Sequence, residues 1–174
     1  MEGMSLRVLE TERLIVRQLA SDDAEFICKL LNEPSFLRNI GDKGVRTTAD
    51  AIQYIREGPL ASYERFGFGL YLVELKETGS AIGICGLIKR EALADIDVGF
   101  ALLPAFWSKG YAFEAADAVV TYGKSVLGIS RIVAITAPDN NSSIKVLEKL
   151  GMRFEGLIRL SEKEGELKLF APRD

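Results

Sequence analysis

Residues 68–103 contain three short apolar segments in close succession, and this pattern leaves few folds open. Apolar and polar residues alternate in FGLYLVELK (68–76), and AIGICGLIK (81–89) and IDVGFALL (96–103) follow it. Such segments are typical of β-strands, and the connections between them are too short to hold a crossover helix. The middle of the chain therefore predicts an antiparallel sheet.

Helical and strand patterns flank this region on both sides. Before it, the spacing predicts a strand at 13–19, a helix at 21–32 that ends before Pro34, a loop, and a helix that Thr47 or Thr48 caps and Pro59 ends or kinks. After it, the spacing predicts a helix at 110–127, a strand at 131–137, a helix at 140–150, and strands at 152–160 and 166–171. No repeat or flexible linker interrupts the pattern. We therefore expect residues 1–174 to form one domain of the α+β (mixed α/β) class.

The composition excludes several functions. The chain has 22 Lys and Arg against 25 Asp and Glu, and its net charge of −3 excludes the basic surface of a typical nucleic-acid-binding protein. Because it contains no histidine, no histidine acts as a general base or a metal ligand. Cys28 and Cys85 form no CxxC pattern, so we expect no metal site. Two reduced thiols are expected, with a single disulfide as the alternative.

The sequence also bears on location and assembly. No segment approaches the roughly 20 apolar residues that a membrane helix needs. Residues Met1 to Ser5 do not begin a secretion signal. We therefore expect a cytoplasmic protein without a membrane partner. We expect a monomer or a homodimer, the latter if an exposed final strand pairs two copies.

Residues 104–115, PAFWSKGYAFEA, are the most informative segment for function. A strand ends at Pro104, and a short loop leads directly into a helix. The first amides of that helix have no partner within it and lie at the positive end of its dipole. Gly110 lets a ligand approach the backbone closely, Ala112 keeps the next turn clear, and Lys109 adds a positive charge. This arrangement is typical of a pyrophosphate site, although surface helices with a glycine near their start share the pattern.

Further segments share an order and spacing with a known family. They are TERLIVRQL (11–19), GSAIGICGL (79–87), DVGF (97–100) with WSKGYAFEA (107–115), and DNNSSIKVLEKLGM (139–152). Together they resemble the GNAT superfamily of acetyl-CoA-dependent N-acetyltransferases, and within it the ribosomal-protein N-terminal acetyltransferase (RimJ/RimL-type) branch. The resemblance implies a mostly antiparallel, twisted sheet of about six to seven strands flanked by about four helices. It also implies direct transfer of an acetyl group from acetyl-CoA to a primary amine, either a protein N-terminus or a small molecule.

The resemblance further implies which residues bind the cofactor. The superfamily's pyrophosphate loop, Gln/Arg-x-x-Gly-x-Gly/Ala, falls on residues 107–112. The backbone amides implied to hold the pyrophosphate are those of Ser108, Lys109, Gly110, Tyr111, Ala112 and Phe113. The backbones of Phe100 and Leu102 are implied to pair with the pantetheine arm. The remaining implied contacts come from Asn140, Ser143 and Lys145.

Two residues are candidates for acid–base chemistry. Asp97 stands where the branch often has a glutamate, which implies a general base acting through a water. A salt-bridged carboxylate is the alternative, and Asp95 is its rival on the same face. Leu147 occupies the position where many relatives have a tyrosine acid. Ser143, or Ser142, is therefore the candidate donor to the leaving thiolate, with helix capping as the alternative.

The acceptor contacts are less defined. Tyr54, Tyr63 and Phe66 lie where the first helices of the superfamily build the acceptor groove, and we expect the loop 36–45 to shape it. A non-catalytic CoA-binding module with the same fold is the alternative function. A dinucleotide-binding enzyme is disfavoured, because the glycines of strand 81–89 are not followed by a helix.

Overall fold

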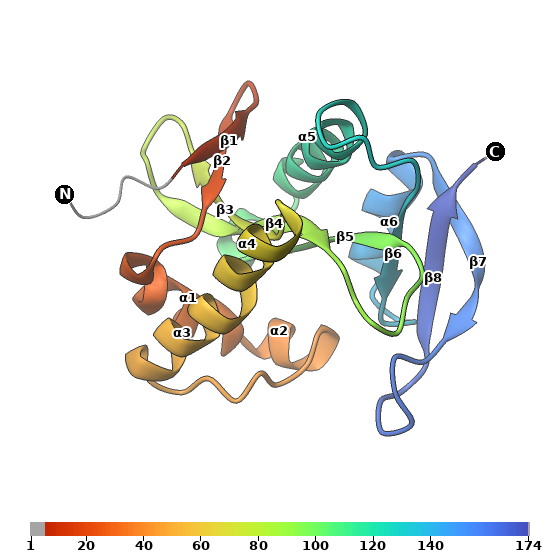
Figure 1. Cartoon of the computed structure of the whole chain (residues 1–174), viewed down its shortest axis with the longest axis horizontal. Coiled ribbons are helices and arrows are strands. Elements are labelled where there is room, and N and C mark those ends of the chain that lie inside the picture. Colours follow the sequence, from red (N-terminus) through yellow and green to blue (C-terminus); the bar gives the residue numbers. More distant parts are fainter. Residues whose placement is uncertain (1–5, 174) are drawn as a thin grey trace.

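The computed structural model describes residues 6–173, which form an eight-stranded sheet with helices packed against it (Figure 1). The strands are β1 (Arg7–Glu10), β2 (Leu14–Gln18), β3 (Leu70–Leu75), β4 (Ala81–Ile88), β5 (Ile96–Leu102), β6 (Ile132–Thr136), β7 (Met152–Ile158) and β8 (Leu167–Pro172). The α-helices are α1 (Ala24–Leu31), α2 (Pro34–Asn39), α3 (Thr48–Ile55), α4 (Ala61–Phe66), α5 (Tyr111–Ser125) and α6 (Asn141–Lys149). Residues 1–5, on which the expected absence of a secretion signal rests, lie outside the described part of the chain.

The order of the strands is β1-β2-β3-β4-β5-β6-β8-β7. All neighbouring strands are antiparallel except β5 and β6, which are parallel and are connected through α5. The short turns between β3, β4 and β5 enforce antiparallel pairing, whereas the helix allows a parallel crossover. The structure thus confirms the predicted α+β class and the mostly antiparallel sheet.

Some elements differ from the sequence prediction. The short edge strand β1 is an addition, and Pro34 begins the helix α2, where a proline loses no helical hydrogen bond. Pro59 does not end its helix. It lies in a π-helical turn at Arg56–Leu60, after which the chain continues as α4. Thr47 caps α3, because its hydroxyl accepts a hydrogen bond from the Asp50 amide at 3.0 Å.

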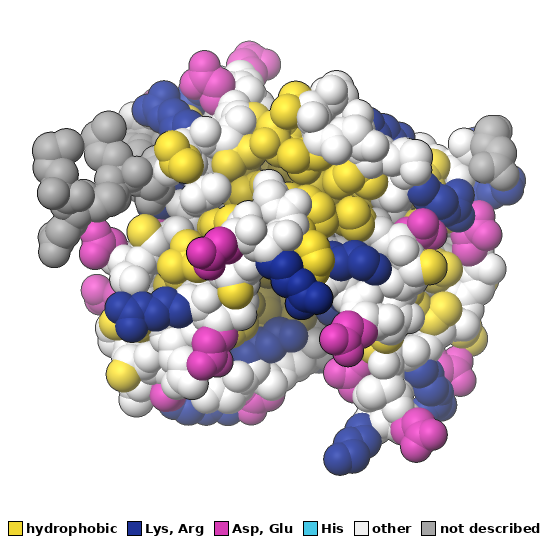
Figure 2. Space-filling model, viewed as in Figure 1, with side chains coloured by type: hydrophobic (Ala, Val, Ile, Leu, Met, Phe, Trp, Pro, Cys, Tyr) yellow, Lys and Arg dark blue, Asp and Glu magenta, His cyan; other side chains and the backbone are white. Residues whose placement is uncertain are grey.

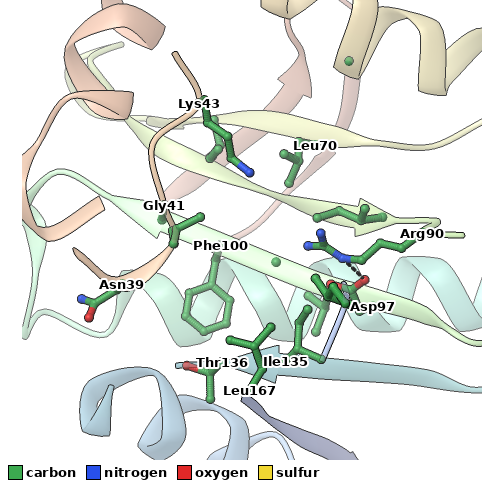
Figure 3. A pocket seen from close by; sticks show the side chains of 18 of the residues that line it. Asn39, Gly41, Lys43, Leu70, Arg90, Asp97, Phe100, Ile135, Thr136 and Leu167 are labelled. Atoms are coloured by element: carbon green, nitrogen blue, oxygen red, sulfur yellow. Dashed lines mark hydrogen bonds and ion pairs between the residues drawn. The ribbon is translucent and has the colours of Figure 1, made fainter. Parts of the chain in front are cut away.

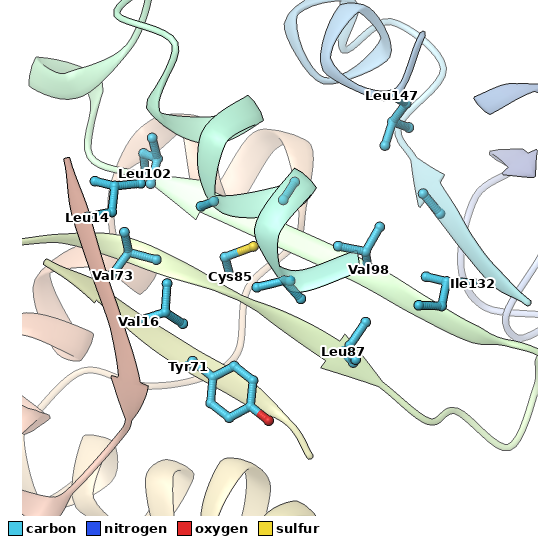
Figure 4. Close-up of a cluster of buried hydrophobic side chains, with 14 of the residues drawn as sticks. Leu14, Val16, Tyr71, Val73, Cys85, Leu87, Val98, Leu102, Ile132 and Leu147 are labelled. Carbon is cyan, nitrogen blue, oxygen red and sulfur yellow. The ribbon is translucent and has the colours of Figure 1, made fainter. Parts of the chain in front are cut away.

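Two apolar cores lie on opposite faces of the sheet, because successive side chains of a strand point to opposite sides. Tyr71 and Val73 belong to the core shared with α5 and α6, whereas Leu72 belongs to the core shared with α1 and α3. Figure 4 shows the first core, in which Cys85 is fully buried. Cys85 and the partly exposed Cys28 are both free thiols.

Strands β5 and β6 separate soon after they meet. Their paired residues are Ile96 with Ile132 and Asp97 with Val133, and no later pair is formed between the two strands. Strand β6 continues beside β8 on its other edge. The edge of β5 from 98 to 102 therefore faces an opening rather than a described strand. This opening lies next to the loop that starts α5.

The last strand of the chain is not at an edge of the sheet. Strand β8 lies between β6 and β7, so the edges are β1 and β7 (Figure 1). Strand β8 is therefore not exposed for pairing with a second copy, whereas β7, the other of the two final strands, lies at an edge. Within residues 6–173, none of the helices has the length and apolarity needed to cross a membrane.

Candidate active site

The loop before α5 contains two residues in the left-handed conformation. Gly110 has φ of 83° and Ser108 has φ of 61°, and Ser108 is the one non-glycine residue among 6–173 with positive φ. The first hydrogen bond within the helix runs from the Glu114 amide to the Gly110 carbonyl at 3.0 Å. The amides of residues 111–113 therefore have no acceptor inside α5. Left-handed residues at such a turn gather backbone N–H groups into a concave surface that suits an anion.

A clamp of polar side chains, consisting of Thr11, Arg13 and Glu114, fastens this loop to the start of β2. Arg13 Nε lies 2.7 Å from Glu114 Oε1, and the Thr11 hydroxyl and the Arg13 amide donate to Glu114 Oε2. The Arg13 guanidinium also donates to the Lys109 carbonyl at 3.0 Å and lies 4.3 Å from the centre of the Tyr111 ring. Partial burial alone would raise the pKa of Glu114, but the hydrogen bonds from Thr11 and Arg13 outweigh it and lower the pKa. Glu114 is thus a charged anchor for the loop.

The loop opens into a groove of about 730 Å³, which we call the α5 groove. Its walls come from the start of α5, the end of β5, the start of α6 and, opposite them, α2. The candidate cofactor residues that line it are Phe100, Leu102, Ser108, Gly110, Tyr111, Ala112, Phe113, Asn140, Ser143 and Lys145. Lys109 is the candidate that does not line the groove, and its carbonyl accepts a hydrogen bond from Arg13.

The edge of β5 presents backbone groups to the α5 groove. The Leu103 amide donates to the Ile82 carbonyl in β4 at 2.9 Å. Because antiparallel pairing alternates, the amides and carbonyls of Phe100 and Leu102 point away from β4. The Leu102 carbonyl already accepts a hydrogen bond from Trp107 Nε1 at 2.9 Å. Phe100 thus keeps both of its backbone groups for a ligand, whereas the Leu102 carbonyl also holds the loop in place.

Asn140 and Ser143 lie together at the start of α6. The side-chain oxygen of Asn140 accepts a hydrogen bond from the Ser143 amide at 3.3 Å, so Asn140 caps the helix. The residue that caps α6 is therefore Asn140, and neither Ser142 nor Ser143 has that role. Leu147, at the position of the relatives' tyrosine, is 1% exposed and packs into the core.

A second cavity of about 850 Å³, which we call the Asp97 pocket, adjoins the α5 groove. Its walls come from α2 and the following loop, the segment from the end of α3 through α4, the end of β4, β5, β6, α6 and the connection between β7 and β8. The two cavities share lining residues, among them Phe100, Asn140 and Ser143. Figure 3 shows Phe100 pointing into the gap between β5 and β6, toward Thr136 and Leu167. A molecule in one cavity can therefore meet a molecule in the other at Phe100.

Asp97 is buried in the wall of this pocket, with 1% of its surface exposed. Burial raises the pKa of its carboxyl group, and the Arg90 guanidinium, whose Nε lies 2.9 Å from Asp97 Oδ1, opposes this increase without cancelling it. Asp97 is thus ion-paired and also more basic than an ordinary carboxylate. Asp95 precedes β5, pairs with Arg131 at 3.3 Å and lines neither cavity, so it is not a rival.

The three aromatic residues considered for the acceptor have different positions. Tyr54 and Phe66 line the Asp97 pocket, as does the loop that follows α2. Tyr63 does not line it. Its hydroxyl accepts from the Leu19 amide at 3.1 Å and donates to the Leu70 carbonyl, so it joins β2 to β3 from α4. Of the three aromatic residues, Tyr63 therefore has a structural position outside the Asp97 pocket.

Sequence reasoning missed Lys43 and Arg90, which contribute cations to the Asp97 pocket. They lie in separate loops, and no motif links them. It also missed the clamp roles of Thr11 and Arg13. Both belong to the segment TERLIVRQL, whose resemblance to the family could have indicated a role for them. Among residues 6–173, no group of three or more Cys, Asp or Glu side chains is placed to hold a metal ion.

The chain is similar to known proteins in sequence and in fold. The family described as acetyltransferase (GNAT) domain matches residues 13–153, which is most of the chain. An N-acetyltransferase of Bacillus subtilis (strain 168), YoaA, named as uncharacterized, is 34% identical over 154 residues. That match covers 87% of this chain and 86% of YoaA.

Solved structures show the same fold. An acetyltransferase from Agrobacterium tumefaciens strain C58 superimposes with a TM-score of 0.81 at 25% identity, covering 99% of this chain and 97% of that one. The ribosomal alpha-N-protein acetyltransferase RimL, in complex with coenzyme A, superimposes with a TM-score of 0.82. It is 16% identical, and the match covers 95% of this chain and 96% of RimL. At that identity, the likeness to RimL concerns the fold.

Proposed function

Because the chain belongs to the GNAT acetyltransferase family, we propose that it moves the acetyl group of acetyl-CoA directly to a primary amine within a ternary complex. The observation that carries this proposal is the junction of two cavities at Phe100, Asn140 and Ser143. One cavity offers free backbone amides to a diphosphate, and the other contains a buried carboxylate. Both substrates can therefore be bound at once, without an acylated enzyme.

In this proposal the α5 groove binds acetyl-CoA. The amides of Ser108 and of residues 110–113, which line the groove, hold the pyrophosphate, since they lie at a helix N-terminus and in a concave turn. The backbones of Phe100 and Leu102 pair with the pantetheine arm as an added strand, and Asn140 and Lys145 contact the arm and a phosphate. An amide of β5 directed at the thioester carbonyl would stabilise the oxyanion that forms during attack.

The reaction needs a neutral amine. Its nitrogen attacks the thioester carbonyl carbon, the carbon–sulfur bond breaks, and the CoA sulfur leaves as a thiolate. Asp97, acting through a water, accepts the proton that the amine loses, and its raised pKa makes it a better base than an ordinary carboxylate. Ser143 is the proposed donor to the thiolate. A thiol with a pKa of about 8.5 also leaves readily without an acid.

The acceptor in this proposal is a protein N-terminus or a small amine. An α-amino group is easier to neutralise at pH 7 than a lysine, because its pKa is about 8 rather than about 10. Among solved structures of the same fold, the ribosomal alpha-N-protein acetyltransferase RimL supports a protein N-terminus, and a spermidine N-acetyltransferase supports a small amine. The continuous sheet of eight strands supports the proposal that the chain is one domain.

The test is acetyl-CoA turnover by the purified protein with a panel of peptides and small amines. We expect thiol release above the hydrolytic background with at least one amine, together with acetylated product by mass spectrometry. Calorimetric titration with CoA is run in parallel. Tight CoA binding without turnover across the whole panel would overturn the proposal and favour a non-catalytic CoA-binding module.

A further inference from the structure

Cations gather around the Asp97 pocket. Figure 2 shows Lys and Arg side chains around a hollow in the middle of this face of the molecule. Lys43 and Arg90, which line the pocket, come from the loop after α2 and the segment after β4. In Figure 3 the side chains of Lys43 and Arg90 enter the pocket from two sides. Two like charges directed into one cavity repel each other unless an anion lies between them.

We infer that the amine acceptor of this enzyme carries a carboxylate or phosphonate group close to its amine, and that Lys43 and Arg90 bind this group in the Asp97 pocket. The inference rests on the proposed function, because it names the acceptor class for the same site. It does not follow from the family, whose members accept many kinds of amine.

Lys43 has the properties of a ligand-binding cation. Within residues 6–173 its ammonium group forms no ion pair and no hydrogen bond with another side chain. The side chain of Lys43 is exposed, yet partial desolvation at the pocket and the nearby Arg90 cation lower its pKa, and Glu164 opposes them only in part. An anion bound beside Lys43 would stabilise its charged form and so oppose this decrease in pKa.

Arg90 has hydrogen-bonding capacity to spare. Its Nε donates to Asp97 at 2.9 Å, and its two Nη atoms donate no hydrogen bond to another side chain within residues 6–173. A guanidinium presents donors in a planar fork that matches a carboxylate or a phosphonate. Tyr54 lies close enough to Arg90 for that cation to oppose the burial-induced rise of its pKa, so a neutral hydroxyl donor is also near.

The other carboxylates of the wall do not neutralise these cations. Asp42 pairs with Arg46, Glu166 pairs with Arg159, and Glu57 accepts a hydrogen bond from Gln53. Glu164 acts on Lys43 at a distance but forms no ion pair with it. Asp97 offsets the charge of Arg90, so of these two cations Lys43 is the one whose charge is left for an anion within the described part of the chain.

The position of Arg90 restricts the shape of the acceptor. The same guanidinium contacts Asp97, the proposed base, and faces the proposed anion site. The amine must lie near Asp97 while the anion lies on the adjacent Nη atoms, so only a short linkage separates the two groups. Small α-amino acids and aminoalkylphosphonates meet this requirement, whereas neutral alkylamines and polyamines do not.

The test compares acceptors that differ only in the anion. One pair is 2-aminoethylphosphonate and propylamine, and the other is alanine and alaninamide. The amine of alaninamide is less basic and hence more often neutral, so any preference for alanine cannot come from amine ionisation. We expect kcat/KM to favour the anionic member of at least one pair by about 10-fold or more. A preference within the alanine pair indicates a carboxylate site, and a preference within the 2-aminoethylphosphonate pair indicates a phosphonate site.

Variants assign that preference to a residue. Lys43→Met should reduce the ratio between the paired acceptors by about 10-fold, and Lys43→Arg should retain most of it. Lys124→Met, on the exposed side of α5 and outside both cavities, is the matched control and should leave the ratio unchanged. A ratio near one in the wild type, or an unchanged ratio in Lys43→Met, would overturn the inference.

A binding measurement separates this inference from the proposed function. The same four amines are titrated calorimetrically into the complex of the protein with CoA, which cannot react. Binding of an anionic amine that Lys43→Met abolishes supports the acceptor class even where no turnover is found. Turnover of neutral and anionic amines alike supports the proposed function and rejects the acceptor class. If the anionic amines are neither bound nor acetylated, the proposed acceptor class is rejected as well.

Discussion

The α5 groove and the Asp97 pocket meet at Phe100 but are built in different ways. The groove takes its chemistry from backbone amides that a single turn and the start of one helix place together. The pocket takes its chemistry from side chains, Lys43, Arg90 and Asp97, which come from separate loops and a strand. A backbone site depends on local conformation, whereas a side-chain site depends on how distant segments pack. The two should therefore respond to different substitutions.

The largest effect is expected from Gly110→Asp in the α5 groove. Gly110 has φ of 83°, and a new carboxylate would lie beside the CoA diphosphate, with its Cβ 3.3 Å from Arg13 Nη2. We expect CoA affinity by calorimetry to fall on the order of 1,000-fold, from backbone strain and charge repulsion together. Gly128→Asp, at φ of 71° in open space, carries similar strain without the diphosphate. The CoA affinity of Gly128→Asp should stay close to the wild-type value. If it falls as far as that of Gly110→Asp, the loss of affinity does not come from the groove.

A smaller effect, confined to the other cavity, is expected from Asp97→Asn. This change should lower kcat by about 100-fold and leave CoA affinity near its wild-type value. Because burial raises the pKa of Asp97, wild-type activity should fall as pH decreases through a value above that of an ordinary carboxylate. The variant should lose this acidic limb. Asp95→Asn is the control, since Asp95 pairs with Arg131 outside both cavities. Equal pH profiles for wild type and Asp97→Asn would exclude Asp97 as the base.

The clamp sharpens the comparison, because it acts on the groove through side chains. Glu114→Gln keeps the shape of the side chain but removes the charge that Arg13 and Thr11 bind. We expect the KM for acetyl-CoA to rise about 10-fold with a smaller change in kcat, because a loosened loop binds the diphosphate less well. Glu155→Gln, which removes an exposed pair with Arg153, should have neither effect. A fall in kcat alone would mean that Glu114 does not act through cofactor binding.

The smallest effect is expected from Lys109→Met. The family resemblance implies that Lys109 is a cofactor residue, but Lys109 does not line the α5 groove. If the groove binds through its backbone, this variant should change CoA affinity by only about 2-fold, as an exposed charge does. The affinity is measured by calorimetry at low and at moderate salt. A loss of tenfold or more would show that side-chain charge contributes to the groove after all.

The same contrast explains what the sequence could predict. The pattern of residues 104–115 identifies the α5 groove, because a strand end, a turn and a helix start are local and short in sequence. Strands and long helices follow from periodicity for the same reason. The strand β1 is missed because four residues, RVLE, are too few for a period, and α2 because Pro34 signals both the end of one helix and the start of another.

The Asp97 pocket escapes such reasoning. Lys43 lies in a glycine-containing loop and Arg90 in a turn, and neither position has a periodic or motif-like neighbourhood. Only packing brings them to one cavity. Asp97 was identified from the resemblance, but its ion pair with Arg90 was not, and without the fold its pKa shift could not be assigned a direction. The resemblance predicts Asp97 as a candidate base, and the fold determines the burial and the ion pair that change its pKa.

The placement of β8 has a consequence for biosynthesis. Strand β7 leaves the ribosome before β8, yet its only strand neighbour within residues 6–173 is β8, which in turn lies against β6. The nascent chain therefore holds β7 unpaired until residues 167–172 emerge. Leu167 also belongs to the wall of the Asp97 pocket. Ribosome-bound chains that stop short of β8 should already hold the sheet from β1 to β6 but lack one wall of the Asp97 pocket.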